Sequence, residues 1–347
     1  MQTIGIIGIG LAGLRCAAEL RERGFTGTII GWNGEDGQPY DRPPLSKELF
    51  GDFHHLLADD GLGDLDELAV ETRGAAESVS LDTTWRVNGT CVDVLIIATG
   101  ARPVQSISGA RTLYFKDDAE ALRSAITSGS TVHVVGAGWI GMEVASVASA
   151  VGAHVNVWEA SPHFLDRTFH GGVDKLWARW CDEAGVRVHL GTPYPGGRCD
   201  VLIQATGARP AVDVVPFGVR SERGALMADE NGHVLDAQGA VVPGLYAAGD
   251  CAELAGRPGG HWTQALSDAA RVAAHITANP APRAEPSEVF STQFGHEITL
   301  IGEVPACDPG THEGLSIRWA NGAFLGIDAP RETSRARKAL RKQLNAA

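Results

Sequence analysis

The sequence predicts an α/β fold in which two similar βαβ units each contribute a parallel sheet and a small α+β segment follows. The main observation is an internal repeat. The segment Asp93–Pro103 recurs as Asp200–Pro210, and the two copies differ only at Ile97 and Gln204. Each copy lies downstream of a strand, a glycine loop and a helix. The chain therefore contains two versions of one architecture, which is too few copies for a solenoid.

The first unit covers residues 1–103. An apolar run predicts a strand at Thr3–Ile7, and a helix follows the glycine loop to about Arg23. Gly24 is a typical helix stop, and Thr26–Ile30 reads as the second strand. Strands that alternate with helices in this way indicate a parallel sheet.

The second unit covers residues 131–210 and follows the same order. It predicts a strand at Thr131–Val135, a helix to about Val151 that ends at Gly152, and a strand at His154–Trp158. The similar spacing indicates that the two units perform the same kind of binding.

The other segments are less regular. Residues 48–78 are acidic and rich in loop-forming residues, and the prolines of residues 279–288 indicate a linker. Beyond this linker, Val289–Ile301 and Leu315–Ile327 read as strands of a small domain, and a basic helix begins near Arg331.

Composition excludes several classes of protein. A formal net charge of −13 does not suit a general nucleic-acid binder, which needs a basic surface. No apolar run approaches the roughly 18 residues of a membrane span, and no signal peptide is evident, so we expect a cytoplasmic protein. The six cysteines are scattered and the histidines lack metal-ligand spacing, so we expect neither a redox-active cysteine pair nor a metal site.

Two glycine loops carry the clearest chemistry, because each fits the G-x-G-x-x-G pattern between a strand and a helix. The first glycine makes the turn, the second lets a pyrophosphate approach the backbone, and the third permits close helix–strand packing. The helix N-terminus then favours the negative charge of the phosphates. The residues expected to bind are Gly8, Gly10, Leu11, Ala12 and Gly13 in the first loop, and Gly136, Gly138, Trp139, Ile140 and Gly141 in the second.

An acidic residue about 20 positions after such a loop is expected to bind ribose hydroxyls. In the second unit this residue is Glu159, and its carboxylate would repel a 2′-phosphate, which favours NADH over NADPH. In the first unit the candidate is Glu35, although it comes a little late, and Asn33 is an alternative.

The segment Pro39–Lys47 resembles the Y-x-R-P-P-L-S-K segment of ferredoxin reductases that serve oxygenases, and of the related apoptosis-inducing flavoproteins. The resemblance implies FAD in the first unit and NADH in the second. It implies that Lys47 lies near the flavin N5, with Arg42 and Pro43 also binding FAD. It further implies that Glu143 pairs with Lys47 and meets the nicotinamide.

The same resemblance covers two later segments. In Gly244–Asp250 it implies that Gly249 and Asp250 bind FAD, with the aspartate at the ribityl chain. In the next helix it implies that His261 and Trp262 lie beside the flavin, where the helix dipole favours the reduced ring. The repeated segments supply the remaining residues, which are Ala98, Thr99 and Gly100 for FAD and Thr206 and Gly207 for NAD.

The fold predicted is thus α/β, with two Rossmann-like nucleotide-binding domains of the glutathione-reductase-like fold and a small C-terminal α+β domain. We expect an FAD domain at residues 1–112 and 213–283, an NAD domain at 113–212, and the small domain at 284–347.

The resemblance implies an enzyme that passes electrons from NADH through FAD to a ferredoxin-type iron–sulfur protein, with Lys47, Glu143 and Trp262 as catalytic residues. A monomer or homodimer is expected, without nucleic acid or membrane as partners.

Residues 191–199 are shorter than the family's hairpin at that place, and the C-terminal domain is trimmed. Two alternatives therefore stay open, namely a flavoenzyme that acts directly on oxygen or a small molecule, and a nucleotide-responsive redox binding protein. The basic tail is either a surface for an acidic ferredoxin or a solvated helix face.

Overall fold

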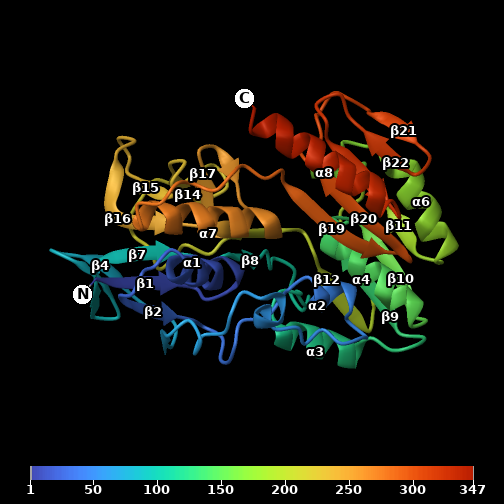
Figure 1. Cartoon of the computed structure of the whole chain (residues 1–347). Helices are drawn as coiled ribbons and strands as arrows, with labels where there is room; N and C mark the ends of the chain where they lie inside the picture. Colours follow the sequence, from blue (N-terminus) through green and yellow to red (C-terminus); the bar gives the residue numbers. More distant parts are fainter. Residues whose placement is uncertain (1, 347) are drawn as a thin grey trace. The chain divides into compact units, whose positions relative to one another are not determined.

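The computed structural model describes residues 2–346, which divide into two compact units (Figure 1). Unit 1 comprises residues 2–41, 55–102 and 209–285, and unit 2 comprises 42–54, 103–208 and 286–346. Residues 1 and 347, the outer ends of the expected first and last domains, lie outside the described residues.

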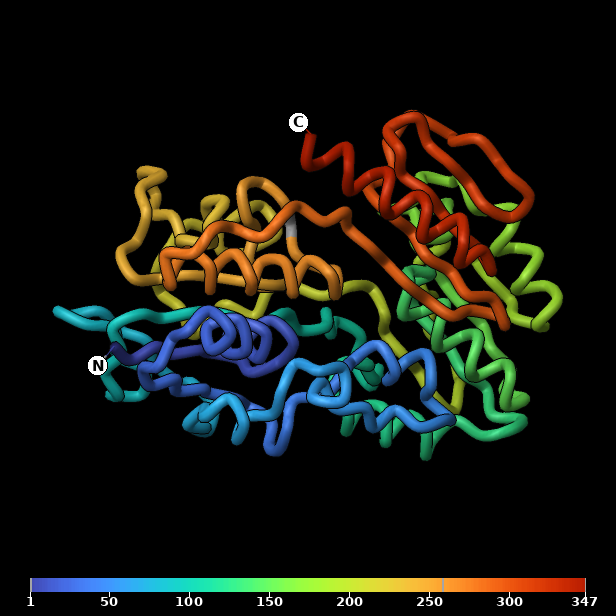
Figure 2. The backbone as a smooth tube through the Cα atoms, viewed as in Figure 1, coloured from blue at the N-terminus to red at the C-terminus, as the bar shows by residue number. Residues whose placement is uncertain are grey.

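Unit 1 is built on a nine-stranded sheet with the order β18-β17-β14-β15-β16-β7-β1-β2-β3. Its central strands β16, β7, β1, β2 and β3 are parallel neighbours. The strands are β1 (Thr3–Ile7), β2 (Thr28–Trp32), β3 (Val70–Arg73), β7 (Val94–Ile97), β14 (Leu226–Ala228), β15 (His233–Leu235), β16 (Val241–Ala247), β17 (Ala252–Leu254) and β18 (Arg257–Pro258). Figure 2 shows the segment 209–285, in gold and orange, returning beside the blue and teal N-terminal segments.

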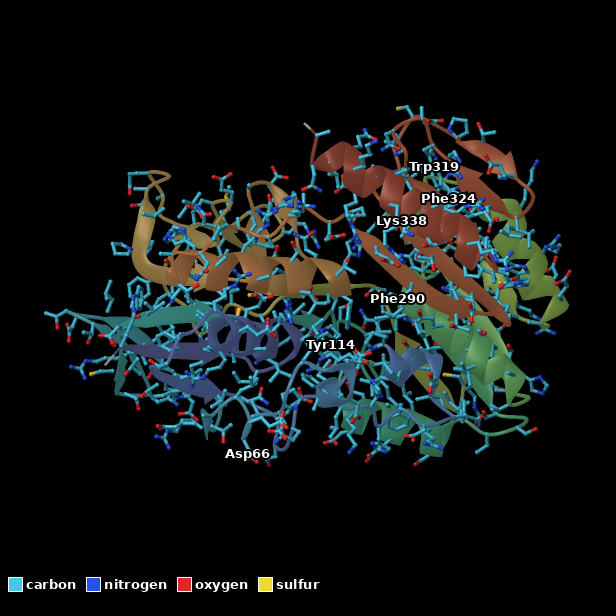
Figure 3. The ribbon with its side chains drawn as sticks, in the orientation of Figure 1. Asp66, Tyr114, Phe290, Trp319, Phe324 and Lys338 are labelled. Carbon is cyan, nitrogen blue, oxygen red and sulfur yellow. The ribbon has the colours of Figure 1, made fainter. Side chains whose placement is uncertain are left out.

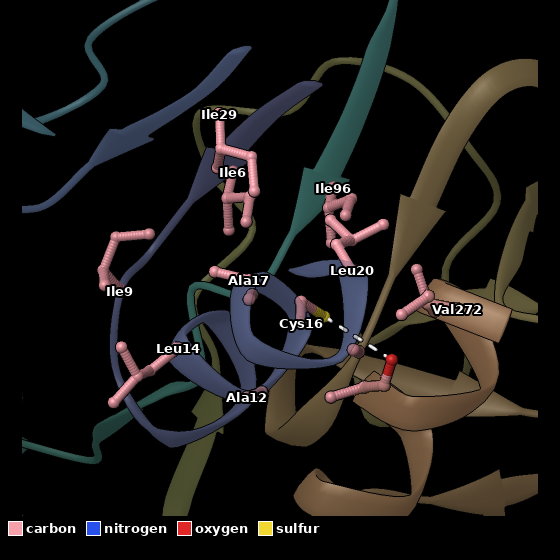
Figure 4. Packing of buried hydrophobic residues seen from close by; sticks show 14 of the residues in the cluster. Ile6, Ile9, Ala12, Leu14, Cys16, Ala17, Leu20, Ile29, Ile96 and Val272 are labelled. Carbon is pink, nitrogen blue, oxygen red and sulfur yellow. Dashed lines mark hydrogen bonds between the residues drawn. The ribbon is translucent and has the colours of Figure 1, made fainter. Parts of the chain in front are cut away.

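Two different layers cover this sheet, because successive side chains of a strand point to opposite faces. Ile4 and Ile6 of β1 pack with α1 (Leu11–Glu22) and α7 (Trp262–Ile276), and Figure 4 shows this core around Cys16. Ile7 belongs to the opposite core. There the cover is a three-stranded antiparallel sheet of β4 (Val79–Leu81), β5 (Trp85–Val87) and β6 (Thr90–Val92). Two short 3₁₀ helices complete the unit, η1 (Leu57–Asp60) and η2 (Gly249–Cys251).

Unit 2 contains a four-stranded parallel sheet with the order β11-β10-β9-β12. Its strands are β9 (Thr131–Val135), β10 (His154–Trp158), β11 (Arg187–His189) and β12 (Val201–Gln204). Its helices are α2 (Pro44–Lys47), α3 (Lys116–Ala125), α4 (Trp139–Ala150), α5 (Asp166–Phe169) and α6 (Asp174–Glu183). Helix α4 packs on β9 and β10, so its N-terminus lies at the carboxyl end of the sheet. Two further strands, β8 (Ala101–Pro103) and β13 (Ala208–Pro210), pair with each other.

The C-terminal segment of unit 2 forms a five-stranded antiparallel sheet with α8 (Pro330–Leu344) packed against β20 and β23. Its strands are β19 (Glu288–Gln293), β20 (His296–Ile301), β21 (Thr311–Glu313), β22 (Ser316–Arg318) and β23 (Phe324–Ile327). The strand pairs and the basic helix expected after the proline-rich linker are therefore present. Among residues 2–346, none of the helices has the length and apolar character required to span a bilayer.

The repeat seen in the sequence is also a repeat of hydrogen bonds. Asp93 and Asp200 occupy the same position in the two copies, and each carboxylate accepts a backbone N–H at 2.7 Å, from Thr3 and Thr131 respectively. The one internal difference follows from burial. Ile97 lies in the apolar core. The Gln204 amide oxygen instead accepts the backbone N–H groups of Ser106 and Ile107, and its NH₂ group donates to the hydroxyls of Ser106 and Thr206.

One predicted strand was displaced at both ends, since Thr26–Ile30 was expected and β2 covers Thr28–Trp32. The second strand begins at Thr28, two residues later than expected, because Arg21 donates hydrogen bonds to the carbonyls of Phe25 and Gly27 and holds them in a turn. The other predicted strands of the two nucleotide-binding units begin and end as expected. The three-domain division stays a prediction, because compact packing does not show which segments fold independently.

Candidate functional site

The first glycine loop lies in unit 1 at the carboxyl end of β1, where parallel α/β sheets bind their ligands. Gly8 has φ +91°, and a Cβ there would lie 2.4 Å from the carbonyl oxygen of Ala98. At Gly13 a Cβ would lie 2.0 Å from the carbonyl oxygen of Gly8, so that α1 can approach β1 only without a side chain. Gly10 differs, because a Cβ there would meet no atom within 4 Å. Packing therefore explains two of the three glycines and gives no reason for the third, Gly10.

Three other predicted FAD-binding segments of unit 1 lie near this loop. A Cβ at Gly249 would lie 3.0 Å from the Cβ of Ala12, so η2 packs against the start of α1. Helix α7 also packs on η2 and begins at Trp262, whose indole N–H donates to Asp41 at 2.9 Å. Ala98, Thr99 and Gly100 follow β7, the strand next to β1. The first loop, Gly249 and the start of α7 therefore lie close together, as the sequence predicts for a shared ligand.

The ribose contact of the first unit has two candidates. Glu35 lies three residues after β2 and accepts a hydrogen bond from the hydroxyl of Tyr40 at 2.5 Å. Asn33 follows β2 directly, in the position that Glu159 has after β10. The geometry therefore favours Asn33 as the counterpart of Glu159, and the role of Glu35 stays a prediction.

The second glycine loop, in unit 2, repeats the first closely. A Cβ at Gly136 would lie 2.4 Å from the carbonyl oxygen of Ala205, and one at Gly141 would lie 2.0 Å from that of Gly136. At Gly138 a Cβ would again meet no atom within 4 Å. The backbone at Gly138 has φ −80° and ψ −174°, an extended conformation that any residue adopts. The chain itself therefore gives no reason for a glycine at this position.

Glu159 lies directly against the second loop. Its carboxylate accepts the backbone N–H of Ala137 at 2.8 Å and that of Ser161 at 2.8 Å. These bonds hold the carboxylate beside the loop, as a residue that reads the adenine ribose requires. Trp139 and Ile140 open helix α4, and the side chain of Ile140 is exposed.

Sequence reasoning missed Arg167, which extends beside the repeated segment. Its Nη1 lies 3.2 Å from the position of a Cβ on Gly207. The segment that carries it is held near the glycine loop, because Leu165 donates its N–H to the carbonyl of Ala137 at 3.0 Å. Leu165 and His170 flank α5 with φ +46° and +48°, a costly conformation for residues other than glycine. The only possible signal was a basic residue eight positions after Glu159, and only the fold shows that it reaches Gly207.

Thr206 and Gly207, predicted to bind NAD, follow β12 at the same end of the sheet as the second glycine loop, because β12 and β9 are parallel. The hydroxyl of Thr206 accepts a hydrogen bond from the Gln204 amide at 2.8 Å. This bond fixes the threonine side chain, whereas Gly207, with φ +105°, leaves room for Arg167, whose Nη1 would lie 3.2 Å from a Cβ there.

Unit 2 also brings Lys47 and Glu143 together. Glu143 lies in the first turns of α4, is 4% exposed, and accepts a hydrogen bond from Ser46 of α2 at 2.5 Å. Burial raises the pKa of Glu143 above its ordinary value, and the Lys47 ammonium is the strongest of the groups that lower it. The Lys47 Nζ also lies 4.0 Å from the centre of the Phe290 ring, a cation–π contact. The predicted pairing of Lys47 with Glu143 is thus supported by charge and position.

The three predicted FAD contacts after Asp41 lie in unit 2. Arg42 donates to the carbonyl of Tyr114 at 2.6 Å and lies over its ring at 4.5 Å, which anchors the segment to the start of α3. Pro43 precedes α2, and its φ of −51° suits the start of that helix. The segment that resembles ferredoxin reductases is therefore a structured turn and helix.

The cysteines and the basic side chains of α8 were also singled out in the sequence. All six cysteines are free, and Cys16 and Cys251 are buried in unit 1. The basic face of α8 includes Arg335 and Lys338, which are exposed, and Figure 3 shows Lys338 on that helix.

Comparison with known proteins gives the following matches. Residues 2–195 match the pyridine nucleotide-disulphide oxidoreductase family, and residues 205–266 match the FAD binding domain family. Terpredoxin reductase from Pseudomonas sp. is 30% identical over 88% of this chain and 82% of its own length. The ferredoxin reductase component of chlorobenzene dioxygenase from Cupriavidus sp. strain PS12 is 30% identical over 95% of this chain and 90% of its own length. The crystal structure of a covalent putidaredoxin reductase–putidaredoxin complex has a TM-score of 0.86 at 21% identity, covering 98% of this chain and 93% of that chain, and shows the same fold.

Proposed function

Because this chain belongs to the pyridine nucleotide-disulphide oxidoreductase family, and within it to the ferredoxin reductases of oxygenase systems, we propose that it oxidises NADH and passes the electrons through FAD to a ferredoxin-type iron–sulfur protein. Terpredoxin reductase and the ferredoxin reductase component of chlorobenzene dioxygenase each match most of this chain. Its free cysteines include no C-x-x-C pair, which suits a route without a dithiol.

The observation that carries this proposal is the open space at Gly10 and Gly138. At both positions a Cβ would meet no protein atom within 4 Å, although each loop is otherwise tightly packed. A pyrophosphate that approaches the backbone at each loop accounts for both glycines. The residues present therefore fit two dinucleotides, FAD at the first loop and NADH at the second.

In this proposal each part of the chain has a distinct task. FAD, when bound, takes up a hydride equivalent and releases electrons one at a time. Glu159 orients the adenine ribose of NADH, and Arg167 offers positive charge near its phosphates. Glu143, buried and acted on by the charge of Lys47, serves the nicotinamide end. In unit 1 the α7 N-terminus at Trp262 favours negative charge on the FAD.

Anaerobic titration of the FAD-loaded protein with NADH tests the proposal. NADH should bleach the flavin absorbance, and an added ferredoxin should restore it rapidly. Recovery only with oxygen or a small molecule would instead identify a direct-acting flavoenzyme. Slow reoxidation of the bleached flavin, together with an NADH-dependent change of oligomeric state, would identify a redox binding protein.

The preference for NADH over NADPH should depend on the charge of Glu159. In Glu159→Gln the amide oxygen can still accept a backbone N–H, while the negative charge that repels a 2′-phosphate is lost. We expect kcat/KM for NADPH to rise about tenfold and that for NADH to fall about tenfold, since about 1.4 kcal/mol changes a rate constant tenfold. Unchanged selectivity between the two nucleotides would show that Glu159 only supports the loop. An exposed control, Asp66→Asn, should change neither value.

We also propose that the protein works in the cytoplasm. Its cysteines form no disulfide among the described residues, as is usual in a reducing compartment. Recovery of the native protein only from an extracytoplasmic fraction would contradict this.

A further inference from the structure

A chain of hydrogen bonds in unit 2 leads from helix α6 through strand β19 to Glu143. The indole N–H of Trp177 donates to Gln293 Oε1 at 2.7 Å, and Gln293 Nε2 donates to Ser291 Oγ at 2.9 Å. Ser291 Oγ in turn lies 2.5 Å from Glu143 Oε1. Trp177 and Gln293 are 0% exposed, so water does not compete for these groups. The chain therefore connects three elements through buried polar atoms only.

The direction of this chain is set by its first member. An indole nitrogen can only donate, so Gln293 must present its oxygen to Trp177 and its NH₂ group to Ser291. Ser291 Oγ then accepts from Gln293 and has its own proton left for Glu143. As a result, Oε1 of the carboxyl group must accept a hydrogen bond from Ser291.

The second carboxyl oxygen has different surroundings. Glu143 Oε2 accepts a hydrogen bond from Ser46 Oγ at 2.5 Å. If the carboxyl group is protonated, the same hydroxyl can instead accept a hydrogen bond from its O–H. A proton on Glu143 would therefore reside on Oε2, toward Ser46, and not on Oε1. The carboxyl group can change its protonation state without disturbing the Trp177 side of the chain.

Few other charges act on Glu143. The elements packed on α4 are α2, β9, β10 and β19, and Lys47 of α2 is the group whose charge acts on this carboxyl. The remaining titratable or charged groups on those elements have other surroundings: His133 contacts Tyr194, His154 is exposed, and Glu288 pairs with Arg337. The two serine hydroxyls and Lys47 therefore define the environment of Glu143.

We propose that Trp177, Gln293 and Ser291 are positioning residues for Glu143, which hold Oε1 as an acceptor and so confine any proton on the carboxyl group to Oε2. The inference rests on the proposed function, in which Glu143 meets the nicotinamide. Hydrogen bonds to the charged form of an acid favour that form, so this chain of hydrogen bonds stabilises the Glu143 carboxylate beside Lys47. It also keeps the carboxylate in one orientation during turnover.

The test is the pH titration of the Glu143 carboxyl group, followed by infrared spectroscopy in the FAD-loaded full-length protein. Loss of a C=O band in Glu143→Gln identifies the signal. In Trp177→Phe, Gln293 can turn over and Ser291 is no longer forced to donate to Oε1. We expect the apparent pKa of Glu143 to rise by about one unit, comparable to one hydrogen bond to a charged group. Ser291→Ala should produce a rise at least as large.

Trp180→Phe is the matched control. Trp180 lies on the same helix, is buried, and its Nε1 has no hydrogen-bond partner among the described residues. The control removes the same volume from the core but no link of the chain, so its titration should match that of the unaltered protein. If Trp177→Phe fails to fold, Gln293→Met breaks the same chain at its next member.

The outcomes separate this inference from the proposed function. A titration of Trp177→Phe or Gln293→Met that matches the unaltered protein would overturn the positioning role, whatever the rate of flavin reduction. A shifted titration supports the role even if NADH fails to reduce the flavin, a failure that would contradict the proposed function alone. Where NADH does reduce the flavin, the rate of reduction can also be measured as a function of pH. In Trp177→Phe this pH profile should shift by the same amount as the Glu143 titration, and in Trp180→Phe it should match that of the unaltered protein.

Discussion

Replacing Gly138 with valine should raise the NADH concentration for half-maximal flavin reduction at least about a hundredfold, while the thermal stability stays unchanged. The new Cβ would meet no protein atom within 4 Å, and the extended backbone conformation suits valine. It would instead occupy the space where we propose that the pyrophosphate approaches the loop. A loss of about 2.7 kcal/mol of binding free energy corresponds to a hundredfold change. Stopped-flow reduction of the flavin and a thermal melt measure the two quantities.

Gly141→Ala is the contrasting variant in the same loop. Its Cβ would lie 2.0 Å from the carbonyl oxygen of Gly136, so α4 must move away from β9. We expect a lower melting temperature as well as weaker NADH binding. If Gly138→Val instead lost stability, or kept its affinity for NADH, the open space would not be a nucleotide site. The same comparison of Gly10→Val with Gly13→Ala should separate FAD affinity from stability in unit 1.

The second large effect concerns Asp268 and the dependence of stability on pH. Asp268 lies on α7, is 1% exposed, and accepts the N–H of Gly249 at 3.4 Å and the Gln264 amide at 3.0 Å. Burial raises the pKa of its carboxyl group from 3.8 to about 7, although Gly249, Arg257, Gln264 and Arg271 act in the opposite direction. Below about pH 7 the folded protein therefore keeps a proton that the unfolded chain releases near pH 4.

This difference makes the folded state less stable as the pH rises. Between about pH 4 and pH 7 the folded protein binds more protons than the unfolded chain, so the free energy of unfolding falls with pH and then levels off. The interval between the two pKa values corresponds to about 4 kcal/mol, at about 1.4 kcal/mol per unit. Asp268→Asn keeps the shape and one acceptor oxygen, for the Gly249 N–H, and its NH₂ group can donate to the Gln264 amide oxygen once that amide turns over, but it cannot ionise. We expect it to be the more stable protein at pH 8, by up to this amount.

Thermal unfolding of the FAD-loaded protein at pH 5 and pH 8 measures this effect. The gain from Asp268→Asn should be large at pH 8 and small at pH 5, where Asp268 is already protonated. Asp66→Asn, an exposed substitution on the same unit, should show no such difference. An Asp268→Asn protein that is no more stable than the unaltered one at pH 8 would show that the buried carboxylate is compensated by its neighbours.

The sequence by itself determined the two nucleotide-binding units and their glycine loops. Strand and helix periodicity, and the need for glycine where a helix crosses a carbonyl, act over a few neighbouring residues and are therefore visible in the chain. The segment Pro39–Lys47 and Glu159 were recognisable for the same reason, since each is a local pattern.

The tertiary structure decided what depends on contacts between distant segments. Ser291 and Gln293 have no local signal, and they reach Glu143 and Trp177 only through contacts between distant segments. Ser46 lies in the recognisable segment Pro39–Lys47, but only the packing of α2 on α4 brings it to Glu143. Burial raises the pKa of the Asp268 and Glu143 carboxyl groups. A turn held by Arg21 delays the start of the second strand to Thr28. Desolvation and hydrogen-bond direction are properties of packed neighbours, and the order of residues along the chain does not contain them.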